Sequence, residues 1–271
     1  MPFRRPWTLL WLSLPIPFRR AVYLGIWQLG IRLYGEERFF HQRAPFDLYM
    51  KRGLSPVLRS GALATILVAT RTTVPVPTIL DFVNDGDHSI MVMTRIQGYP
   101  VREDILGGKM SEEYFESTMS NWLTQLRALP VPDPKRVTGF DGGQCLSFRV
   151  HRVPFGPFPD VASFHKNLLS RCPWDRGHLP NIVGKSHDKP HRITFTHGDL
   201  HVHNILSLNV KMTGLIDWDC AGWFPEYWDY AVAVYHHRRH PFWVGCFSRV
   251  FPQYEDELEI EKEIWKVHCP W

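Results

Sequence analysis

Apolar residues recur at near-helical spacing over 18–34, which predicts an amphipathic helix near the start of the chain. A short strand is expected at 46–51, followed by a mostly apolar helix at 61–70. Two more strands, at 79–83 and 89–95, flank the segment NDGD, which is a strong signal for a hairpin turn. The first hundred residues therefore predict the order helix, strand, helix, strand, strand.

The pattern changes beyond residue 103. A long helix is expected at 111–129, because Ser111 can cap it and two glutamates follow near the positive end of its dipole. The Pro- and Gly-rich stretch 130–160 is expected to be loop. The other expected elements are a helix at 161–169, a turn-rich segment at 171–191, strands at 193–196, 205–208 and 213–217, and helices at 227–236 and 255–267.

These elements indicate an α+β fold with two lobes. The expected division is an N-terminal helical extension over 1–40, a small sheet lobe over 41–103, and a larger, mostly helical lobe over 104–271. A β-ribbon is set into the larger lobe.

Composition narrows the class of protein. Of the 271 residues, 44% are hydrophobic and 21% charged, a balance that excludes an intrinsically disordered, collagen-like or coiled-coil chain. The net charge is only +4, and no Lys/Arg cluster is interleaved with aromatic residues, so we expect no nucleic-acid partner.

Cysteine usage and the start of the chain indicate a cytoplasmic location. The five cysteines form no CxxC pair and are odd in number, as expected in a reducing compartment; they are Cys145, Cys172, Cys220, Cys246 and Cys269. No run approaches the roughly 20 apolar residues that span a bilayer. The first 20 residues contain Pro15 and Pro17 and lack a small-residue cleavage site, which argues against a signal peptide. Peripheral membrane contact by this N-terminal arm is the alternative.

The segment HGDLHVHN at 197–204 has the spacing of a protein-kinase catalytic loop. Such a loop needs an aspartate to orient the acceptor hydroxyl and take its proton. It also needs an asparagine five residues later to hold a metal ion on the phosphates. Asp199 and Asn204 occupy these positions.

A second motif, LIDW at 215–218, follows at the right distance. The 18 residues from Asp199 to Asp217 contain a strand, a turn and a second strand, and this hairpin returns Asp217 beside Asn204. Mg²⁺ prefers hard oxygen ligands. We expect the Asn204 oxygen and the Asp217 carboxylate to lie about 4–5 Å apart and to share Mg²⁺.

The segment FTHGDLHVHNIL, followed by GLIDWDCAGWFPEYWDYA, resembles the aminoglycoside phosphotransferase (APH) family, and within it a divergent branch common in filamentous fungi. VPVP at 74–77, MTRIQG at 93–98 and NWLTQLRALPVP at 121–132 extend the resemblance over about residues 45–265. The resemblance implies a two-lobed, protein-kinase-like fold. It also implies Mg²⁺-assisted transfer of phosphate from ATP or GTP to a hydroxyl of a small molecule, which the sequence does not identify.

The resemblance also implies roles for single residues. Asp199 would be the catalytic base, with Asn204 and Asp217 as metal ligands. Lys51 would contact the nucleotide phosphates. Met93, Thr94, Arg95 and Ile96 would form the hinge whose backbone meets the adenine.

Two further residues support the catalytic loop in this interpretation. Asp229 would be a buried carboxylate that accepts hydrogen bonds from amides of the catalytic loop. His197 would lie beneath the same loop in a structural role.

The chain departs from the family pattern around Lys51. Kinases orient this lysine with a glutamate on the following helix. That position is Gly61 here, and no acidic residue occurs between Asp47 and Asp81. We therefore expect Lys51 to be mobile. No Gly-rich loop precedes it, and LYGEERFFHQRAPF is too short and too charged for a hairpin over the phosphates.

These departures leave alternatives open. One is a catalytically silent relative that serves as a binding or scaffold protein. A more distant one is a zinc hydrolase, because His197, Asp199, His201 and His203 alternate, and further histidines follow at His236, His237 and His240. The acidic stretch 254–263 would meet a cationic acceptor or form a solvated helix face.

Overall fold

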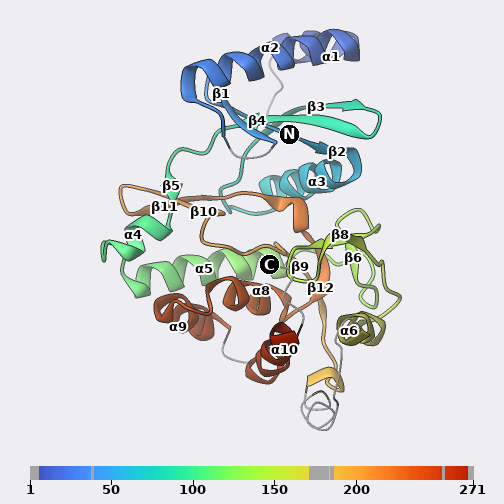
Figure 1. Cartoon of the computed structure of the whole chain (residues 1–271), viewed down its shortest axis with the longest axis vertical. Helices are drawn as coiled ribbons and strands as arrows, with labels where there is room; N and C mark the ends of the chain where they lie inside the picture. The colour runs from blue at the N-terminus through green and yellow to red at the C-terminus, as the bar shows by residue number, and fades with distance from the viewer. Residues whose placement is uncertain (1–5, 38–39, 171–182, 184–185, 252–253, 268–271) are drawn as a thin grey trace.

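The computed structural model describes residues 6–37, 40–170, 183, 186–251 and 254–267. A small sheet lobe lies above a larger, mostly helical lobe (Figure 1). The fold is therefore the α+β, two-lobed arrangement that the sequence predicts.

The small lobe contains one four-stranded antiparallel sheet in the order β1-β2-β4-β3. Its strands are β1 (His41–Ala44), β2 (Leu48–Leu54), β3 (Ile79–Asp85) and β4 (His88–Thr94), and its helices are α1 (Pro6–Ser13), α2 (Ile16–Tyr34) and α3 (Ser55–Arg71). Helix α3 begins six residues before its predicted start at 61, and neither α1 nor β1 was predicted. A four-residue strand such as β1 is too short to show an alternating pattern.

Helices cover both faces of this sheet, and this decides where Lys51 points. Val92 of β4 packs in the cluster with α2, whereas Met91 and Met93 pack with α3. Successive side chains of a strand point to opposite faces. On β2, Met50 therefore joins the α2 cluster, and Lys51 faces the side of α3 and the larger lobe.

Helix α2 is fixed to the sheet by a buried polar cluster around Asp81. The Arg19 guanidinium lies 2.6 Å from one Asp81 oxygen, and the Tyr23 hydroxyl donates to the other at 2.8 Å. Trp11 of α1 donates to the same carboxylate. The opposite side of the two helices exposes Leu9, Leu10, Phe18, Leu29 and Leu33. Within the described residues, no helix is both long and apolar enough to cross a membrane.

In the part of the larger lobe that the structure describes, six helices with defined bounds are joined to short strands. The helices are α4 (Arg102–Leu106), α5 (Glu112–Arg127), α6 (Val161–Ser170), α8 (Trp228–His237), α9 (Pro241–Val250) and α10 (Glu255–Val267). The strands are β5 (Tyr99–Pro100), β6 (Thr138–Gly139), β7 (Cys145–Ser147), β8 (His151–Phe155), β9 (Ile193–Thr196), β10 (Ile205–Leu208), β11 (Lys211–Leu215) and β12 (Gly222–Pro225), with the 3₁₀ turn η1 (Trp218–Cys220). They form the sheets β11-β10-β5, β6-β12-β9 and β7-β8.

Most predicted elements of this lobe are present. Ser111 caps α5 by accepting a hydrogen bond from the Tyr114 amide at 3.2 Å, as the sequence predicts. The stretch 130–160 was predicted as loop but contains β6, β7 and β8, because strands of two to five residues pair with partners that no local pattern reveals. Helix α9 was also not predicted. Most of the segment 171–191 lies outside the described residues.

The acidic helix α10 is not solvated along the whole of its charged face. Glu257 and Glu261 are buried, and the Glu261 carboxylate lies 2.5 Å from the Arg149 guanidinium with both side chains 1% exposed. Much of the negative charge is thus used inside the protein, which corrects both the solvated-face and the acceptor-binding interpretations for these two residues. Three of the five cysteines, Cys145, Cys220 and Cys246, are buried and unpaired; Cys172 and Cys269 lie outside the described residues.

Candidate active site

The loop that follows β9 begins at His197 and is held in place by the buried residue Asp229. Gly198 adopts a left-handed conformation (φ 76°), and a Cβ atom there would lie 2.1 Å from the Cys220 carbonyl oxygen, so only glycine fits. The buried Asp229 carboxylate accepts hydrogen bonds from the amides of His197 (3.1 Å) and Gly198 (2.9 Å). Burial raises the pKa of Asp229, and His197 and the two amides offset this only in part. Asp229 therefore lies where the sequence analysis places it, beneath the loop.

His197 fixes the other side of the loop. Its ring is fully buried, and Nε2 lies 2.9 Å from the carbonyl oxygen of Ile216. The Trp218 ring packs against it with centroids 4.5 Å apart. His197 thus ties the loop to the segment that carries Asp217.

Asp199 and Asn204 are directly bonded within the loop. The Asn204 side-chain nitrogen donates to the Asp199 backbone oxygen and to its carboxylate, both at 2.9 Å. Because the nitrogen of the amide is used in this way, its oxygen is the atom left to meet a cation.

The β10–β11 hairpin brings Asp217 back to this loop. Ile205 pairs with Leu215, and the Ile216 amide donates to the Asn204 carbonyl at 2.9 Å. Asp217 itself adopts a left-handed conformation (φ 69°, ψ 66°), an uncommon state for a residue other than glycine that recurs at functional sites. Asn204 and Asp217 line one cavity. A carboxylate and an amide oxygen at one cavity wall are a donor set that fits a hard divalent cation.

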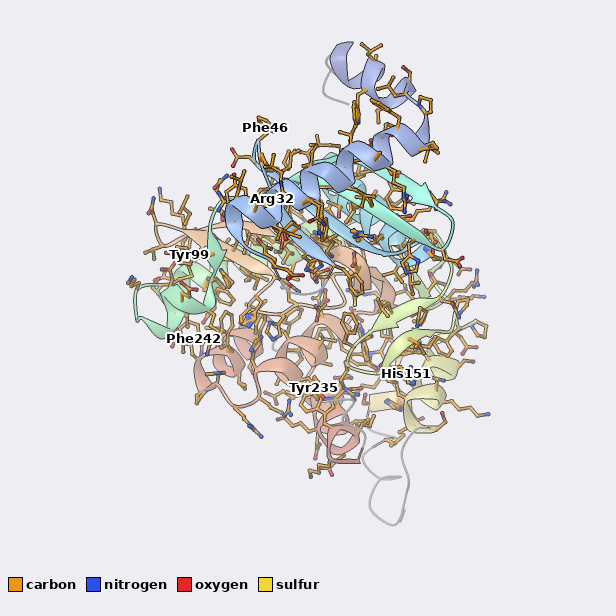
Figure 2. All side chains as sticks on the ribbon, turned by 45° about the horizontal axis from the view of Figure 1, so that its top comes forward. Arg32, Phe46, Tyr99, His151, Tyr235 and Phe242 are labelled. Atoms are coloured by element: carbon orange, nitrogen blue, oxygen red, sulfur yellow. The ribbon has the colours of Figure 1, made fainter. Side chains whose placement is uncertain are left out.

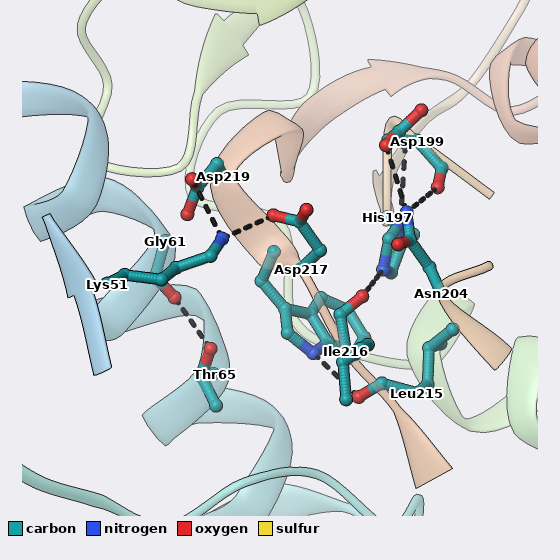
Figure 3. Close-up of polar contacts among 11 residues, drawn as sticks. Lys51, Gly61, Thr65, His197, Asp199, Asn204, Leu215, Ile216, Asp217 and Asp219 are labelled. Carbon is teal, nitrogen blue, oxygen red and sulfur yellow. Dashed lines mark hydrogen bonds and ion pairs between the residues drawn. The ribbon is translucent and has the colours of Figure 1, made fainter. Parts of the chain in front are cut away.

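Lys51 is ion-paired with two carboxylates, not mobile as the sequence led us to expect. Its ammonium lies 2.5 Å from Asp217 Oδ1 and 3.0 Å from Asp219 Oδ2 (Figure 3). Burial by itself would lower the pKa of Lys51, but the two carboxylates outweigh burial and raise it. Conversely, Lys51 outweighs burial at Asp217 and lowers the pKa of that carboxyl.

Asp219 lines the cavity and contacts Lys51, and the sequence analysis did not single it out. Its pKa is raised, because burial and the neighbouring Asp217 charge together exceed the effect of Lys51. The partner of Lys51 was expected on the helix just after it, whereas Asp219 stands 168 residues later in the sequence. Two signals could have found it: the Asp-x-Asp spacing with Asp217, and the glycine at 61.

A cavity of about 440 Å³ lies between the two lobes, in the range of small-ligand sites. Lys51, Asn204, Asp217 and Asp219 line it on the polar side. The apolar lining comes from both lobes: Met91, Met93, Ile96, Leu206, Ile216 and Trp218.

All four predicted hinge residues, Met93 to Ile96, line this cavity. Two of their amides are already used inside the protein: Thr94 donates to the Thr78 carbonyl at 3.0 Å, and Arg95 donates to the Asp47 carbonyl at 2.7 Å. Within the described residues, the Ile96 amide makes no backbone hydrogen bond. Among these predicted hinge residues, Ile96 thus has a backbone amide that could donate to a ligand.

A short hairpin precedes Lys51, in a segment whose sequence was expected to be too short and too charged for a hairpin over the phosphates. Strands β1 and β2 pair antiparallel, with His41 opposite Lys51. The turn contains no glycine; Phe46 and Asp47 adopt positive φ values of 64° and 55°. Phe46 is 88% exposed and projects from the tip (Figure 2).

The same hairpin region contributes polar groups to the cavity. Glu37, His41 and Tyr49 line it, and the Tyr49 hydroxyl donates to the Glu37 carboxylate at 2.5 Å. Burial, with help from Lys51, lowers the pKa of His41, which favours its neutral form. No motif in the sequence indicates these three residues, because single polar residues in irregular segments have no pattern.

The alternating histidines do not form a metal site. The Val202 amide donates to His237 Nε2 at 3.1 Å, and the His203 amide donates to His201 Nδ1 at 3.1 Å. In the part of the chain that the structure describes, the only cluster of three His, Cys, Asp or Glu ligand atoms within 4.8 Å of one another is Glu112–Glu116–Cys246. Arg249 bonds both glutamates of that cluster. The side chain of His236 lies outside the described residues. These contacts do not support a zinc hydrolase.

The chain was compared with protein families, curated sequences and solved structures. The model of the phosphotransferase enzyme family APH matches residues 36–264, whereas no curated protein sequence matches the chain. The GDP and kanamycin complex of APH(2")-IIia superposes with a TM-score of 0.60 at 13% identity, covering 90% of this chain and 88% of that one. A Haemophilus somnus protein named as a fructosamine-3-kinase gives 0.58 at 15%, covering 90% and 89%. APH(3'')-Id of Streptomyces rimosus, with ADP and streptomycin, gives 0.55 at 14%, covering 90% and 96%.

Proposed function

Because this chain belongs to the phosphotransferase enzyme family APH, we propose that it transfers the γ-phosphoryl group of ATP or GTP to a hydroxyl of a small molecule. The observation that supports this most is the joint placement of Lys51, Asn204 and Asp217 around one cavity beside Asp199. These are the groups that phosphoryl transfer needs, because that reaction depends on positioning and on charge stabilisation.

Asp199 acts as the base in this proposal. The acceptor oxygen bonds to the γ-phosphorus, the bond from γ-phosphorus to the β–γ bridging oxygen breaks, and the hydroxyl proton passes to the Asp199 carboxylate. Asn204 holds that carboxylate through its amide nitrogen at 2.9 Å. Asp229 and His197 fix the loop beneath it and make no contact with the reacting atoms.

Asn204 and Asp217 would hold Mg²⁺ through their side-chain oxygens. When bound, the cation neutralises charge on the transferring phosphates. Lys51 supplies a second positive charge at the same place, since its ammonium lies 2.5 Å from Asp217.

The apolar part of the cavity would take the nucleotide base. Met91, Met93 and Ile216 offer flat apolar contacts to a ring system. The Ile96 amide offers the hydrogen bond that orients it. The hydroxyl-bearing acceptor would enter beside Asp199.

The acceptor class is suggested only by the relatives, whose names and titles mention kanamycin, streptomycin and fructosamine. All are polyhydroxylated amines. A panel of such compounds is therefore the first choice for an activity screen.

The test is nucleotide binding and turnover by the purified chain, with and without Mg²⁺. We expect Mg²⁺-dependent binding of ATP or GTP, and turnover with at least one acceptor. Asp199→Asn should lose turnover by at least about 100-fold while nucleotide affinity changes only a few-fold. Asp87→Asn, an exposed carboxylate of the N-lobe, is the matched control and should leave both unchanged.

Two outcomes contradict the proposal in different ways. Nucleotide binding without turnover on the whole panel favours the catalytically silent relative. Absence of any nucleotide binding removes the phosphotransferase assignment altogether.

A further inference from the structure

We propose that Asp219 is the positioning residue of Lys51, in the role that a helix glutamate has in kinases, and that Gly61 is required to admit it. The inference builds on the proposed phosphotransferase function and names a residue that the sequence pattern does not assign. Three observations support it.

The first observation is that two negatively charged side chains contact the Lys51 ammonium. Two carboxylates share this one ammonium, Asp217 at 2.5 Å and Asp219 at 3.0 Å (Figure 3). Asp217 lines the cavity together with Asn204 and would bind the cation. Once its oxygens are occupied by a dication, Lys51 keeps Asp219 as its remaining carboxylate. A lysine held by a fixed carboxylate presents its charge in one place, whereas an unheld one does not.

The second observation is the space at Gly61. A Cβ atom at this position would lie 2.5 Å from Asp219 Oδ1, and 3.2 Å and 3.3 Å from the Asp219 Cα and amide nitrogen. The first distance is shorter than real Cβ contacts, so the Asp219 carboxylate would have to shift to admit a side chain at 61. Gly61 therefore does more than lack the helix glutamate: it leaves the volume in which the Asp219 carboxylate sits.

The third observation concerns the hydrogen-bond partners of the Asp219 carboxylate. Its Oδ2 contacts Lys51, and its buried Oδ1 has no hydrogen-bond partner among the described residues. A buried carboxylate oxygen without a partner is costly. Among the described residues, Lys51 is the hydrogen-bond partner of the Asp219 carboxylate, and this contact fixes the position of the ammonium.

The geometry implies an exchange of roles between two positions. A side chain at 61 would collide with the Asp219 carboxylate, so a glutamate at 61 is introduced together with Asp219→Ala. This makes the inference testable by a two-site swap.

The first measurement is independent of nucleotide. Acetylation of Lys51 by acetic anhydride at pH 7, followed by mass spectrometry, reports how tightly the ammonium is held, because an amine released from its ion pair becomes more accessible to the reagent. We expect at least about fivefold faster labelling in Asp219→Asn and no change in Asp87→Asn. Equal labelling of wild type and Asp219→Asn would overturn the proposal.

The second measurement is the melting temperature of a double-mutant cycle. Gly61→Ala should lower Tm by roughly 3–8 °C in wild type, because the new methyl group collides with Asp219. In the Asp219→Ala background the loss should be less than half as large, since only the contacts of 3.2–3.3 Å remain. Equal losses in both backgrounds would show that Gly61 does not serve Asp219.

The third measurement is the swap itself, read as nucleotide affinity and turnover. Asp219→Ala should lower turnover by roughly 10- to 100-fold. Gly61→Glu/Asp219→Ala should regain about tenfold or more of that loss, whereas Gly61→Gln/Asp219→Ala should not, because its side chain has the same shape but no charge. No gain with glutamate over glutamine would overturn the positioning role.

Two further outcomes separate a metal-binding role of Asp219, and a failure of the proposed function, from the positioning role. If Asp219→Asn raises the Mg²⁺ concentration needed for half-maximal nucleotide binding but leaves Lys51 labelling unchanged, Asp219 is a metal ligand and the proposal is wrong. If the wild type binds no nucleotide, the proposed function fails. The labelling and Tm measurements then still decide whether Asp219 holds Lys51 and needs Gly61.

Discussion

At the scale of single residues, Lys51 differs most from what the sequence led us to expect. The sequence shows no nearby carboxylate to hold it, and loss of such a mobile lysine would cost about tenfold in rate, far less than loss of Asp217. The structure replaces this expectation, because two carboxylates hold the lysine and its side chain is only 6% exposed. A buried ion-paired group matters both to the site and to stability.

We now expect Lys51→Met to lower turnover by roughly 100- to 1,000-fold, similar to Asp217→Asn. The same change leaves Asp217 and Asp219 together without a counter-charge, so it should also destabilise the fold. Both measurements are direct: nucleotide turnover at saturating Mg²⁺, and urea unfolding. Lys109→Met, at an exposed position, is the control.

The pH dependence of the Lys51→Met variant has a defined sign. Without the lysine, the folded-state pKa values of the two carboxyls rise above their unfolded values, because like charges repel in a partly buried site. Folding then favours proton uptake, and the variant should regain stability as pH falls from 7 toward 5. A variant whose stability deficit relative to wild type stays constant over this range would contradict the shared-lysine arrangement.

A second residue-scale prediction concerns histidines far from the cavity. His165 and His187 stack with ring centroids 3.8 Å apart, and His165 Nε2 lies 3.0 Å from the Tyr227 hydroxyl. Burial, then repulsion by neighbouring rings, lowers the pKa of His165 to about 2 and that of His187 to about 4. His191 and Glu257 also face this cluster.

Both rings are therefore neutral in the folded state, while the unfolded chain takes up protons below about pH 6.5. Stability contributed by the neutral rings is complete above that pH and is lost as pH falls toward 4, by at most about 1.4 kcal/mol per pH unit for each ring. His165→Gln should flatten the dependence of unfolding free energy on pH between 6.5 and 4.5. His88→Gln, at an exposed position, should leave the slope as in wild type.

At the scale of elements, helix α10 shows how a charged segment becomes part of a core. Arg149, in the turn between β7 and β8, reaches the Glu261 carboxylate at 2.5 Å and lies over the rings of Tyr235 and Trp265. The Trp265 indole donates to the same carboxylate at 3.1 Å. The pair joins α10 to α8 and to the β7–β8 hairpin.

Breaking this pair on one side should be strongly destabilising. Glu261→Gln leaves a buried guanidinium without its counter-charge, which typically costs about 3–5 kcal/mol. The double change Arg149→Met/Glu261→Gln should cost less than either single change, because no buried charge is left. Urea unfolding of the four proteins forms the cycle; a double variant as unstable as the sum of the singles would refute a coupled pair. Glu259→Gln, on the exposed face of α10, is the control.

At the scale of the whole molecule, the N-terminal helices are part of the N-lobe, although the family match begins only at residue 36. Tyr23 and Trp27 of α2 pack against the sheet face formed by Met50, Val83 and Val92. Gly30 allows close approach, since a Cβ there would lie 2.3 Å from the Arg43 carbonyl. The division of the chain at residues 40 and 103 remains our proposal, with α2 covering the second segment.

Removal of residues 1–35 should therefore expose one face of the sheet, and the truncated chain should lose solubility or melt at a clearly lower temperature. A milder variant separates anchoring from truncation. Asp81→Asn leaves the buried Arg19 unpaired and should cost about 3 kcal/mol or more, with faster proteolysis within 6–35. Asp133→Asn is an exposed control. A truncated chain as stable as the full one would contradict a structural role for the helices.

The sequence by itself determined the candidate site residues that lie close to one another along the chain. Asp199 and Asn204 belong to one loop, and Asp217 follows after one hairpin, so spacing alone could bring them to one place. Turn residues at 84–87 and the cap at Ser111 were also readable, because hairpin turns and helix starts depend on local conformation. The hinge role of Met93 to Ile96 came from the family resemblance and not from a local pattern.

Only the tertiary structure decided what depends on contacts between distant segments. Asp219 reaches Lys51 across 168 residues, and Gly61 matters because η1 packs against α3, which no periodic pattern encodes. The short strands β6, β7 and β8 exist through pairing rather than propensity. Glu261 is buried because Arg149 meets it, although its own segment has the composition of a solvated helix. A local pattern specifies backbone conformation and nearby side chains, whereas burial and charge pairing depend on which elements the fold brings together.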